Sequence, residues 1–204
     1  AIVALGVGFL IGVMQATPDM KRSMDIYYRE SAIYDIDVKG TYGLTQEDIT
    51  AIENAEDGEG NKVVSSVMPV ISTDAIAEYG GTELVARIVG LDFAKVRSGD
   101  YLNKFELIDG NYPEKAGDVV VERYNNYFAD VKMGDTITLA ADGQKQYGDV
   151  YAIEEYKVVG IVASPDYFYR DGREVSTIGT GVVGTVIYGQ AYDSADGAAG
   201  GIYD

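Results

Sequence analysis

The chain has 204 residues, of which 47% are hydrophobic and 24% are charged, a composition typical of a folded globular protein. Its 33 acidic residues outnumber 16 basic ones and give a formal net charge of −17 at pH 7, which would repel a phosphate backbone, so we expect no nucleic-acid partner. The chain has no histidine and no cysteine, which excludes histidine-based catalytic triads and zinc sites built from imidazole or thiolate groups.

The first segment of the chain, AIVALGVGFLIGVMQA, is apolar except for Gln15. As a helix, residues 1–16 would be about 24 Å long, somewhat less than the roughly 30 Å hydrocarbon core of a bilayer. Burying each large apolar side chain is worth roughly 1.5–3 kcal/mol, so this segment is unstable in water. We predict a truncated transmembrane helix; the alternatives are the core of a signal peptide and a buried helix of a soluble domain.

Two features of this segment bear on its membrane partners and orientation. Gly8 and Gly12 form a GxxxG motif, which would let another transmembrane helix pack closely, although small residues are also common in membrane helices without such a role. Lys21 and Arg22 follow the apolar run. They favour a cytoplasmic flank, but two charges are too few to set the orientation.

A helix-start signal comes next. Thr17 can serve as an N-cap, Pro18 suits the first helical position and Asp19 favours the first turn. The residues that follow are apolar at helical spacing, at Met20, Met24, Tyr27 and Tyr28. A helix therefore either restarts at Thr17 or continues through it.

Residues 33–95 are predicted to form a compact β-α-β-β unit. IYDIDVKG (33–40) alternates apolar and polar residues as a half-buried strand does. A helix begins after Thr45, because Thr45 is a good N-cap and acidic residues follow it. A turn at 57–61 leads to two further predicted strands, KVVSSVMPV (62–70) and ELVARIVGLDF (83–93).

Residues 96–193 are predicted to form a second, small mixed α/β or barrel-like module, because glycine and aspartate separate short strand patterns. A strand at 117–130 is expected to run into a short helix. The other expected strands lie within 105–113, 131–140, 156–165 and 184–192. The fold class is therefore α+β, and residues 194–204 are expected to be a tail or linker.

Several of these segments together resemble a known family. DGNYPEKAGDVVVE (109–122), VKMGDTITL (131–139) and VVGIV (158–162) follow one another with GREVSTIGTGVVGTVIYGQAY (172–192) after them. In this order and spacing they resemble the first extracytoplasmic region of MacB/FtsX-like ABC transporter permeases. The likeness extends over nearly the whole chain.

The resemblance implies a permease subunit in the cell membrane, with its soluble domain on the extracytoplasmic side. It implies a transmembrane helix with a helical extension (1–32), a porter-like unit (33–95) and a Sabre-like module (96–193). In such systems a partner ABC ATPase hydrolyses ATP, so this chain is expected not to be an enzyme and to need no cofactor. A second permease copy or subunit is a further expected partner.

Residues that suggest other chemistry have simpler explanations. GTGVVG (179–184) matches the GxGxxG dinucleotide pattern, but the strand-like TVIYG follows it instead of a helix, so we predict a glycine turn. NAEDGEGN lacks the spacing of an EF-hand and is predicted to be a solvated turn. Pairs of carboxylates are expected by chance in so acidic a chain. We assign no catalytic, cofactor or metal residue.

Two aromatic clusters, YNNYF and PDYFYRD, are the remaining candidates for a binding site. Tyrosine suits half-buried strands as well as contact surfaces, so core or loop packing is the favoured interpretation. The alternative function is a membrane-anchored module that binds a glycan or peptide. Its contact residues would be Tyr124, Tyr127, Phe128, Tyr167, Phe168 and Tyr169.

Overall fold

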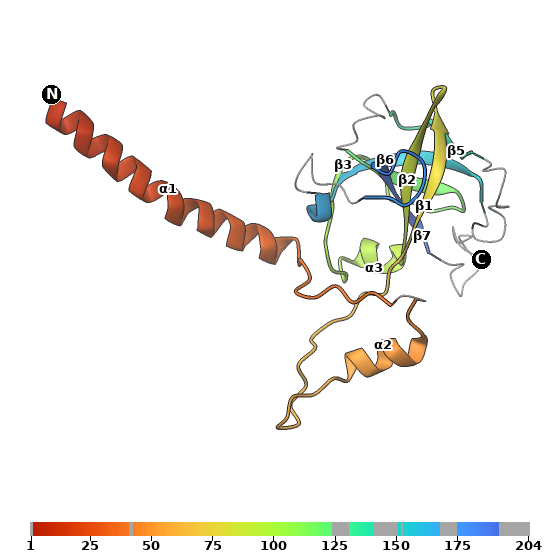
Figure 1. The fold of residues 1–204 in the computed structure, drawn as a ribbon, viewed down its shortest axis with the longest axis horizontal. Coiled ribbons are helices and arrows are strands. Elements are labelled where there is room, and N and C mark those ends of the chain that lie inside the picture. The colour runs from red at the N-terminus through yellow and green to blue at the C-terminus, as the bar shows by residue number, and fades with distance from the viewer. Residues whose placement is uncertain are drawn as a thin grey trace.

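A computed structural model of the chain describes residues 2–40, 43–123, 131–140, 151, 153–167 and 175–191. It has a long N-terminal helix, an extended arm (residues 33–70) and a body of β-strands (from residue 71 onward) (Figure 1). The helical elements are α1 (Ile2–Glu30), α2 (Gln46–Glu53), α3 (Phe93–Ser98) and the 3-10 turn η2 (Pro165–Tyr167). The strands are β1 (Ile71–Tyr79), β2 (Thr82–Leu91), β3 (Glu106–Gly110), β4 (Asp118–Glu122), β5 (Thr136–Leu139), β6 (Glu155–Ala163) and β7 (Val183–Gln190).

Helix α1 projects away from the body (Figure 1). It runs without interruption through Thr17, with Pro18 inside it, so the helix continues instead of restarting. An 18-residue window within it has a mean hydropathy of 1.4, and none of that window is buried. Phe9, for example, is 76% exposed. The helix is therefore long and apolar enough to cross a bilayer, and its exposure argues against a buried helix of a soluble domain.

The seven strands form one sheet in the order β3-β6-β4-β7-β2-β1-β5. Strand β5 also pairs with β6, so six of the strands close on themselves. Neighbours β2 and β7 are parallel, as are β4 and β6, and the other pairs are antiparallel. The α+β class and the strands predicted at 83–93, 105–113, 131–140, 156–165 and 184–192 are confirmed, and so is the strand predicted to begin at 117, which is β4. The short helix predicted after that strand and the tail or linker at 194–204 lie outside the described residues.

The alternation of side chains along the strands divides the core into two clusters. Val119 and Val121 belong to a cluster that takes residues from all six strands of the closed part, so this cluster lies inside it. Val120 points to the opposite face, where Phe93 of α3 and Phe105 belong to the second cluster. Successive residues of a strand point to opposite faces, which explains why consecutive valines serve both clusters.

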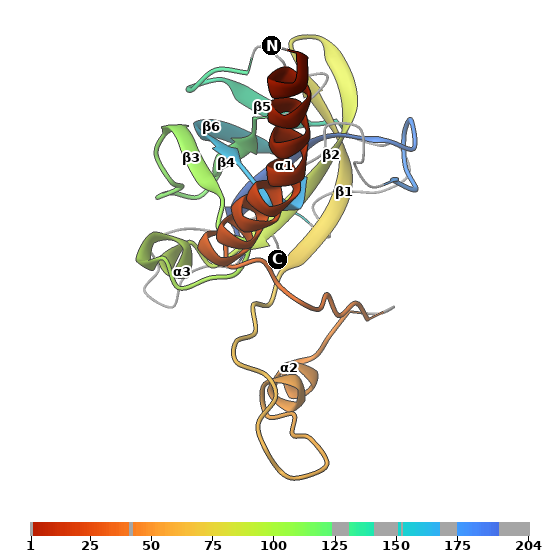
Figure 2. The same ribbon diagram turned by 90° about the vertical axis from the view of Figure 1, so that its left-hand side faces the viewer.

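The arm differs from the prediction in two places. No strand forms at 33–40 or at 62–70 apart from an isolated bridge at Lys62, so both strand predictions are wrong. The side chain of Ile36 is 77% exposed, because no neighbouring strand lies beside this segment in the described structure. Figure 2 shows α2 in the arm, well separated from the sheet.

Local predictions in the arm are confirmed. Helix α2 begins after Thr45, which caps it through a capping box with Asp48. The turn at 57–61 forms, and the Asp57 carboxylate accepts hydrogen bonds from the backbone N–H groups of Glu59 (2.8 Å) and Asn61 (2.9 Å). These features depend only on interactions between neighbouring residues, so they do not require contacts with the body.

The sheet contains strands from both of the units predicted from the sequence. Strand β1 was not predicted, and it pairs with β2 and with β5. Strand β2 pairs with β7. The sheet therefore crosses the predicted boundary between residues 95 and 96, and the division of the chain into units stays a prediction.

Candidate coupling site at the base of helix α1

Helix α1 ends in a pattern of hydrogen bonds that fixes the direction of the chain after it. The backbone N–H of Ala32 donates to the Arg29 carbonyl (3.2 Å), and that of Ile33 donates to the Tyr28 carbonyl (3.1 Å). These two bonds make a Schellman motif, whose turning residue adopts a left-handed conformation. Here that residue is Ala32, with φ of 46°, where glycine is more usual.

The chain after the helix is attached to the body through the backbone. The N–H of Asn103 donates to the Ala32 carbonyl (3.0 Å), and the N–H of Lys104 donates to the Ser31 carbonyl (2.7 Å). Asn103 itself has a φ of 52°. Ala32 and Asn103 are the described non-glycine residues with positive φ, and they are hydrogen-bonded to each other. We call residues 31–34 with 103–104 the joint.

The side chain of Asn103 links the joint to a third segment. Its Oδ1 accepts a hydrogen bond from the backbone N–H of Tyr34 (3.1 Å), and its Nδ2 donates to Oδ1 of Asp166 in η2 (2.7 Å). Asparagine suits this place, because it tolerates a left-handed backbone and carries both a donor and an acceptor. The joint therefore holds the end of α1 against two loops of the body.

Tyr27, in the last turn of α1, adds a side-chain contact. It is half-buried and is hydrogen-bonded to the side chain of Ser31. It also lies within electrostatic range of the carboxylates of Glu122 and Asp166. Tyr27 is therefore partly covered in the last turn of the helix, whereas the apolar first half of the helix is exposed.

No sequence motif marks this site. Asn103 lies in a short stretch, YLNKF, that matches no motif. The one available signal is that asparagine is enriched at positive φ among non-glycine residues. That signal does not say which other segment the residue contacts, because Ala32 and Asp166 lie far from it in sequence.

Of the residues predicted from the sequence to be contact sites, the structure describes Gly8, Gly12 and Tyr167. A Cβ added at Gly8 or Gly12 would meet nothing within 4 Å, so this helix face is open in the structure. Tyr167 is half-buried against the second core cluster. The other five aromatic candidates lie outside the described residues: Tyr124, Tyr127, Phe128, Phe168 and Tyr169.

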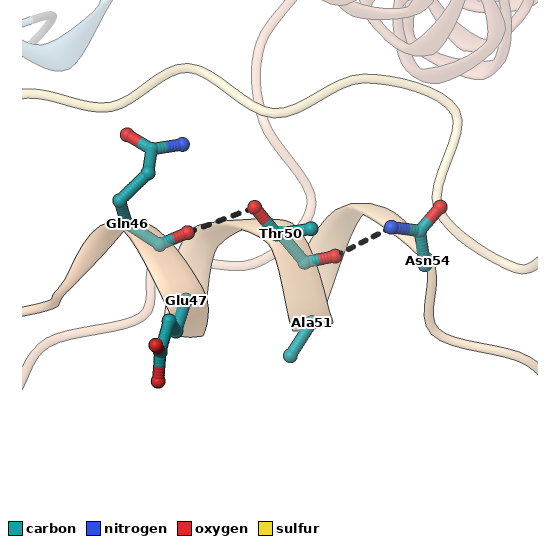
Figure 3. A pocket seen from close by; sticks show the side chains of 5 residues that line it. All are labelled: Gln46, Glu47, Thr50, Ala51 and Asn54. Atoms are coloured by element: carbon teal, nitrogen blue, oxygen red, sulfur yellow. Dashed lines mark hydrogen bonds between the residues drawn. The ribbon is translucent and has the colours of Figure 1, made fainter.

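The pocket beside α2 is shallow and open to solvent (Figure 3). Two of its polar side chains are bonded within the helix: Thr50 Oγ1 donates to the Gln46 carbonyl (2.8 Å), and Asn54 Nδ2 donates to the Thr50 carbonyl (2.8 Å). In the part of the chain that the structure describes, no group of three acidic side chains could hold a metal ion. The helix face therefore shows no chemistry of its own.

The glycine-rich segment at 179–184 is a turn that leads into β7, as predicted. The N–H of Ser176 donates to the Gly181 carbonyl (3.0 Å), and Gly179 and Gly181 have φ of 54° and 76°. A Cβ at Gly179 would lie 2.8 Å from side-chain atoms of Ile76 and Val85. The glycine thus allows the turn to pack closely on β1 and β2.

Comparison with known proteins identifies the family. The family model described as MacB-like periplasmic core domain matches residues 1–199. The chain belongs to this family. Membership confirms the resemblance to the extracytoplasmic region of MacB/FtsX-like ABC transporter permeases.

A solved structure provides a more distant likeness. The extracellular domain of the noncanonic ABC-type transporter YknZ from Gram-positive bacteria is similar at 13% sequence identity, with a TM-score of 0.40. The match covers 73% of this chain and 63% of the YknZ chain, so the MacB-like domain described here spans less than two thirds of that structure. A comparison with curated proteins finds no match.

Proposed function

We propose that this chain is the extracytoplasmic domain of an ABC transporter permease subunit, and that it couples movement of α1 to an extracellular substrate or partner. A partner ABC ATPase would drive that movement by hydrolysing ATP. The observation that carries the proposal is the joint, because it attaches the base of a long, exposed apolar helix to a folded body. A helix can transmit displacement only if its end is held.

The placement of α1 in the cell membrane is part of this proposal. Residues 3–16 would lie in the bilayer, supported by their apolar character and exposure. Residues 17–30 would form a stem outside it, about 21 Å long at 1.5 Å per residue. The soluble body would then lie on the extracytoplasmic side.

Two further parts of the proposal concern partners and domain organisation. The open face at Gly8 and Gly12 would pack against a helix of a second permease copy or subunit. Residues 33–95 would act as the porter-like unit and residues 96–193 as the Sabre-like module. Under the alternative function, a membrane-anchored module that binds a glycan or peptide, the aromatic residues named from the sequence would be the contact residues.

A flexible insertion tests the coupling. A short Gly-Ser segment inserted after Ser31 in the complete permease should abolish most transport while the ATPase still binds, because the helix would then move without the body. The matched control is the same insertion between Gly80 and Gly81, at the turn between β1 and β2, which should leave transport close to normal. Equal transport by both variants would contradict the proposal.

A further inference from the structure

A fully buried carboxylate lies at the end of β4. Glu122 is 0% exposed, although the residues before it on this strand are valines that fill the core. Its Oε2 accepts a hydrogen bond from the backbone N–H of Ser164 (2.8 Å), just after β6. Burying a carboxylate is costly unless it is hydrogen-bonded. The Glu122 side chain therefore constrains the backbone that it bonds, because loss of this hydrogen bond would leave a buried polar group unsatisfied.

The segment that Glu122 holds is the start of η2. Ser164 Oγ accepts from the backbone N–H of Asp166 (3.3 Å), and the Ser164 carbonyl accepts from the N–H of Tyr167 (3.2 Å). Pro165, between them, is buried. The position of the Asp166 carboxylate therefore depends on Ser164, and the position of Ser164 depends in turn on Glu122.

Asp166 connects this turn to the joint. Its Oδ1 accepts from Asn103 Nδ2 (2.7 Å), and Asn103 Oδ1 accepts from the N–H of Tyr34 (3.1 Å). Asp166 is exposed, so water competes with Asn103 for its carboxylate. When the turn holds the carboxylate in place, the hydrogen bond to Asn103 is favoured. The hydrogen bonds form a continuous path from the core at β4 to the residues that follow α1.

We infer that Glu122 is a positioning residue that sets the direction of helix α1 through the 164–167 turn and Asn103. The inference rests on the proposed function for its biological meaning, since a fixed direction matters only if α1 transmits movement. Its physical content is separate from transport. Without Glu122 the turn is free to move, Asp166 no longer holds Asn103, and α1 samples a wider range of directions about the joint.

The experiment measures the direction of α1 relative to the body. Because the chain has no cysteine, the substitutions Arg22→Cys on α1 and Glu83→Cys on β2 provide two unique sites for spin labels. Both side chains are exposed. Pulsed electron paramagnetic resonance of the labelled chain in lipid nanodiscs gives the distribution of distances between the labels, which should be a single narrow peak.

Variants along the path should broaden this peak, and one off the path should not. Glu122→Met, which removes the oxygen that accepts from the Ser164 N–H, Asp166→Ala, which removes the oxygen that accepts from Asn103, and Asn103→Ala should each cause loss of the narrow component. Tyr79→Phe is the matched control, because it removes a hydrogen bond to Asp135 at the far end of β1. It should leave the distribution unchanged. Broadening by the control as well would show general loosening of the body and would overturn the inference.

The remaining outcomes are also decisive. A narrow peak in folded Glu122→Met, with a broad one in Asn103→Ala, would overturn the role of Glu122 and leave the joint intact. If Glu122→Met does not fold, Asp166→Ala decides, because it breaks the path between the turn and Asn103, and an unchanged peak overturns the inference. If the path variants broaden the peak but the complete permease carrying them transports normally, the inference stands and the proposed function fails.

Discussion

The arm and the body contain similar apolar patterns but use them differently. In β1, Ala75 and Ala77 are fully buried, because β2 and β5 flank this strand and the closed sheet covers one face. In the arm, Ile36 and Val63 are 77% and 59% exposed. The difference shows that alternation makes a segment capable of forming a strand, whereas a neighbouring strand is needed for it to become one.

The two regions therefore depend on different interactions. The body is stabilised by long-range strand pairing and by two packed clusters. Helix α2 has no buried residue and is stabilised by its own caps. Substitutions of the same kind should consequently have large effects in the body and small ones in the arm.

The largest difference is expected for alanine at two glycines. Gly110 ends β3 with φ of 81°, and a Cβ there would lie 2.2 Å from the Val159 carbonyl oxygen. Strain at positive φ and overpacking together should cost about 3 kcal/mol or more of unfolding free energy in Gly110→Ala. Gly58→Ala, in the arm, should change it little, because nothing lies within 4 Å. Urea denaturation of both variants measures this, and similar values for the two would contradict the comparison.

The second test compares two ion pairs. Arg87 and Asp74 face each other on β2 and β1, with two hydrogen bonds (2.8 and 3.0 Å) and exposed side-chain fractions of 11% and 17%. Asp74→Ala should destabilise the chain by about 3 kcal/mol, because it leaves a largely buried guanidinium without this carboxylate. Asp37→Ala, which breaks the exposed pair with Lys39 in the arm, should cost about 0–1 kcal/mol. Thermal denaturation distinguishes the two, and a large loss in Asp37→Ala would show that the arm is packed in solution.

The third test removes a cap from the arm alone. Thr45 donates its backbone N–H to Asp48 (2.8 Å), and its side chain accepts from the Asp48 backbone N–H (3.2 Å). Thr45→Ala should destabilise α2 by about 1 kcal/mol. Hydrogen exchange should therefore quicken in α2 while the amides of β1 and β2 keep their protection. Faster exchange in both would mean that the arm and the body unfold together.

The smallest effect is expected in the pH dependence of the body. The Tyr79 hydroxyl and then the Lys132 N–H donate hydrogen bonds to Asp135, which lower the pKa of that carboxyl group. A lowered pKa in the folded state adds stability above the unfolded pKa of about 3.9, and this stability is lost as pH falls through the folded pKa. The stability difference between the chain and Tyr79→Phe should thus be constant near neutral pH and shrink in acid. Urea titrations at a series of pH values measure it, and a difference independent of pH would refute it.

Features that depend on neighbouring residues were predictable. The apolar first half of α1, the Thr45 cap and the glycine turn before β7 all follow from residues a few positions apart. Six strands of the sheet, all except β1, were also predicted, because their apolar runs are bounded by glycine and aspartate. The family resemblance followed from the order of these segments, and the match over residues 1–199 confirmed it.

Features that depend on distant residues were not predictable. Strand β1 was missed because ISTDAIAEY has a weak strand pattern, and it forms through its register with β2 and its pairing with β5. The segment at 33–40 has a better pattern and forms no strand. The pattern of apolar and polar residues within one segment does not predict whether a partner strand lies beside it in the fold.

The sequence alone therefore determined the long apolar helix, the caps and turns, the α+β class and the family. Helical periodicity, capping and turn chemistry act between residues close together in the chain, so the sequence shows them directly. Tertiary structure decided the closure of the sheet, the burial of Glu122 and the joint at Ala32 and Asn103. Each of these requires segments tens of residues apart to meet, and the packing of the whole body determines which segments do so.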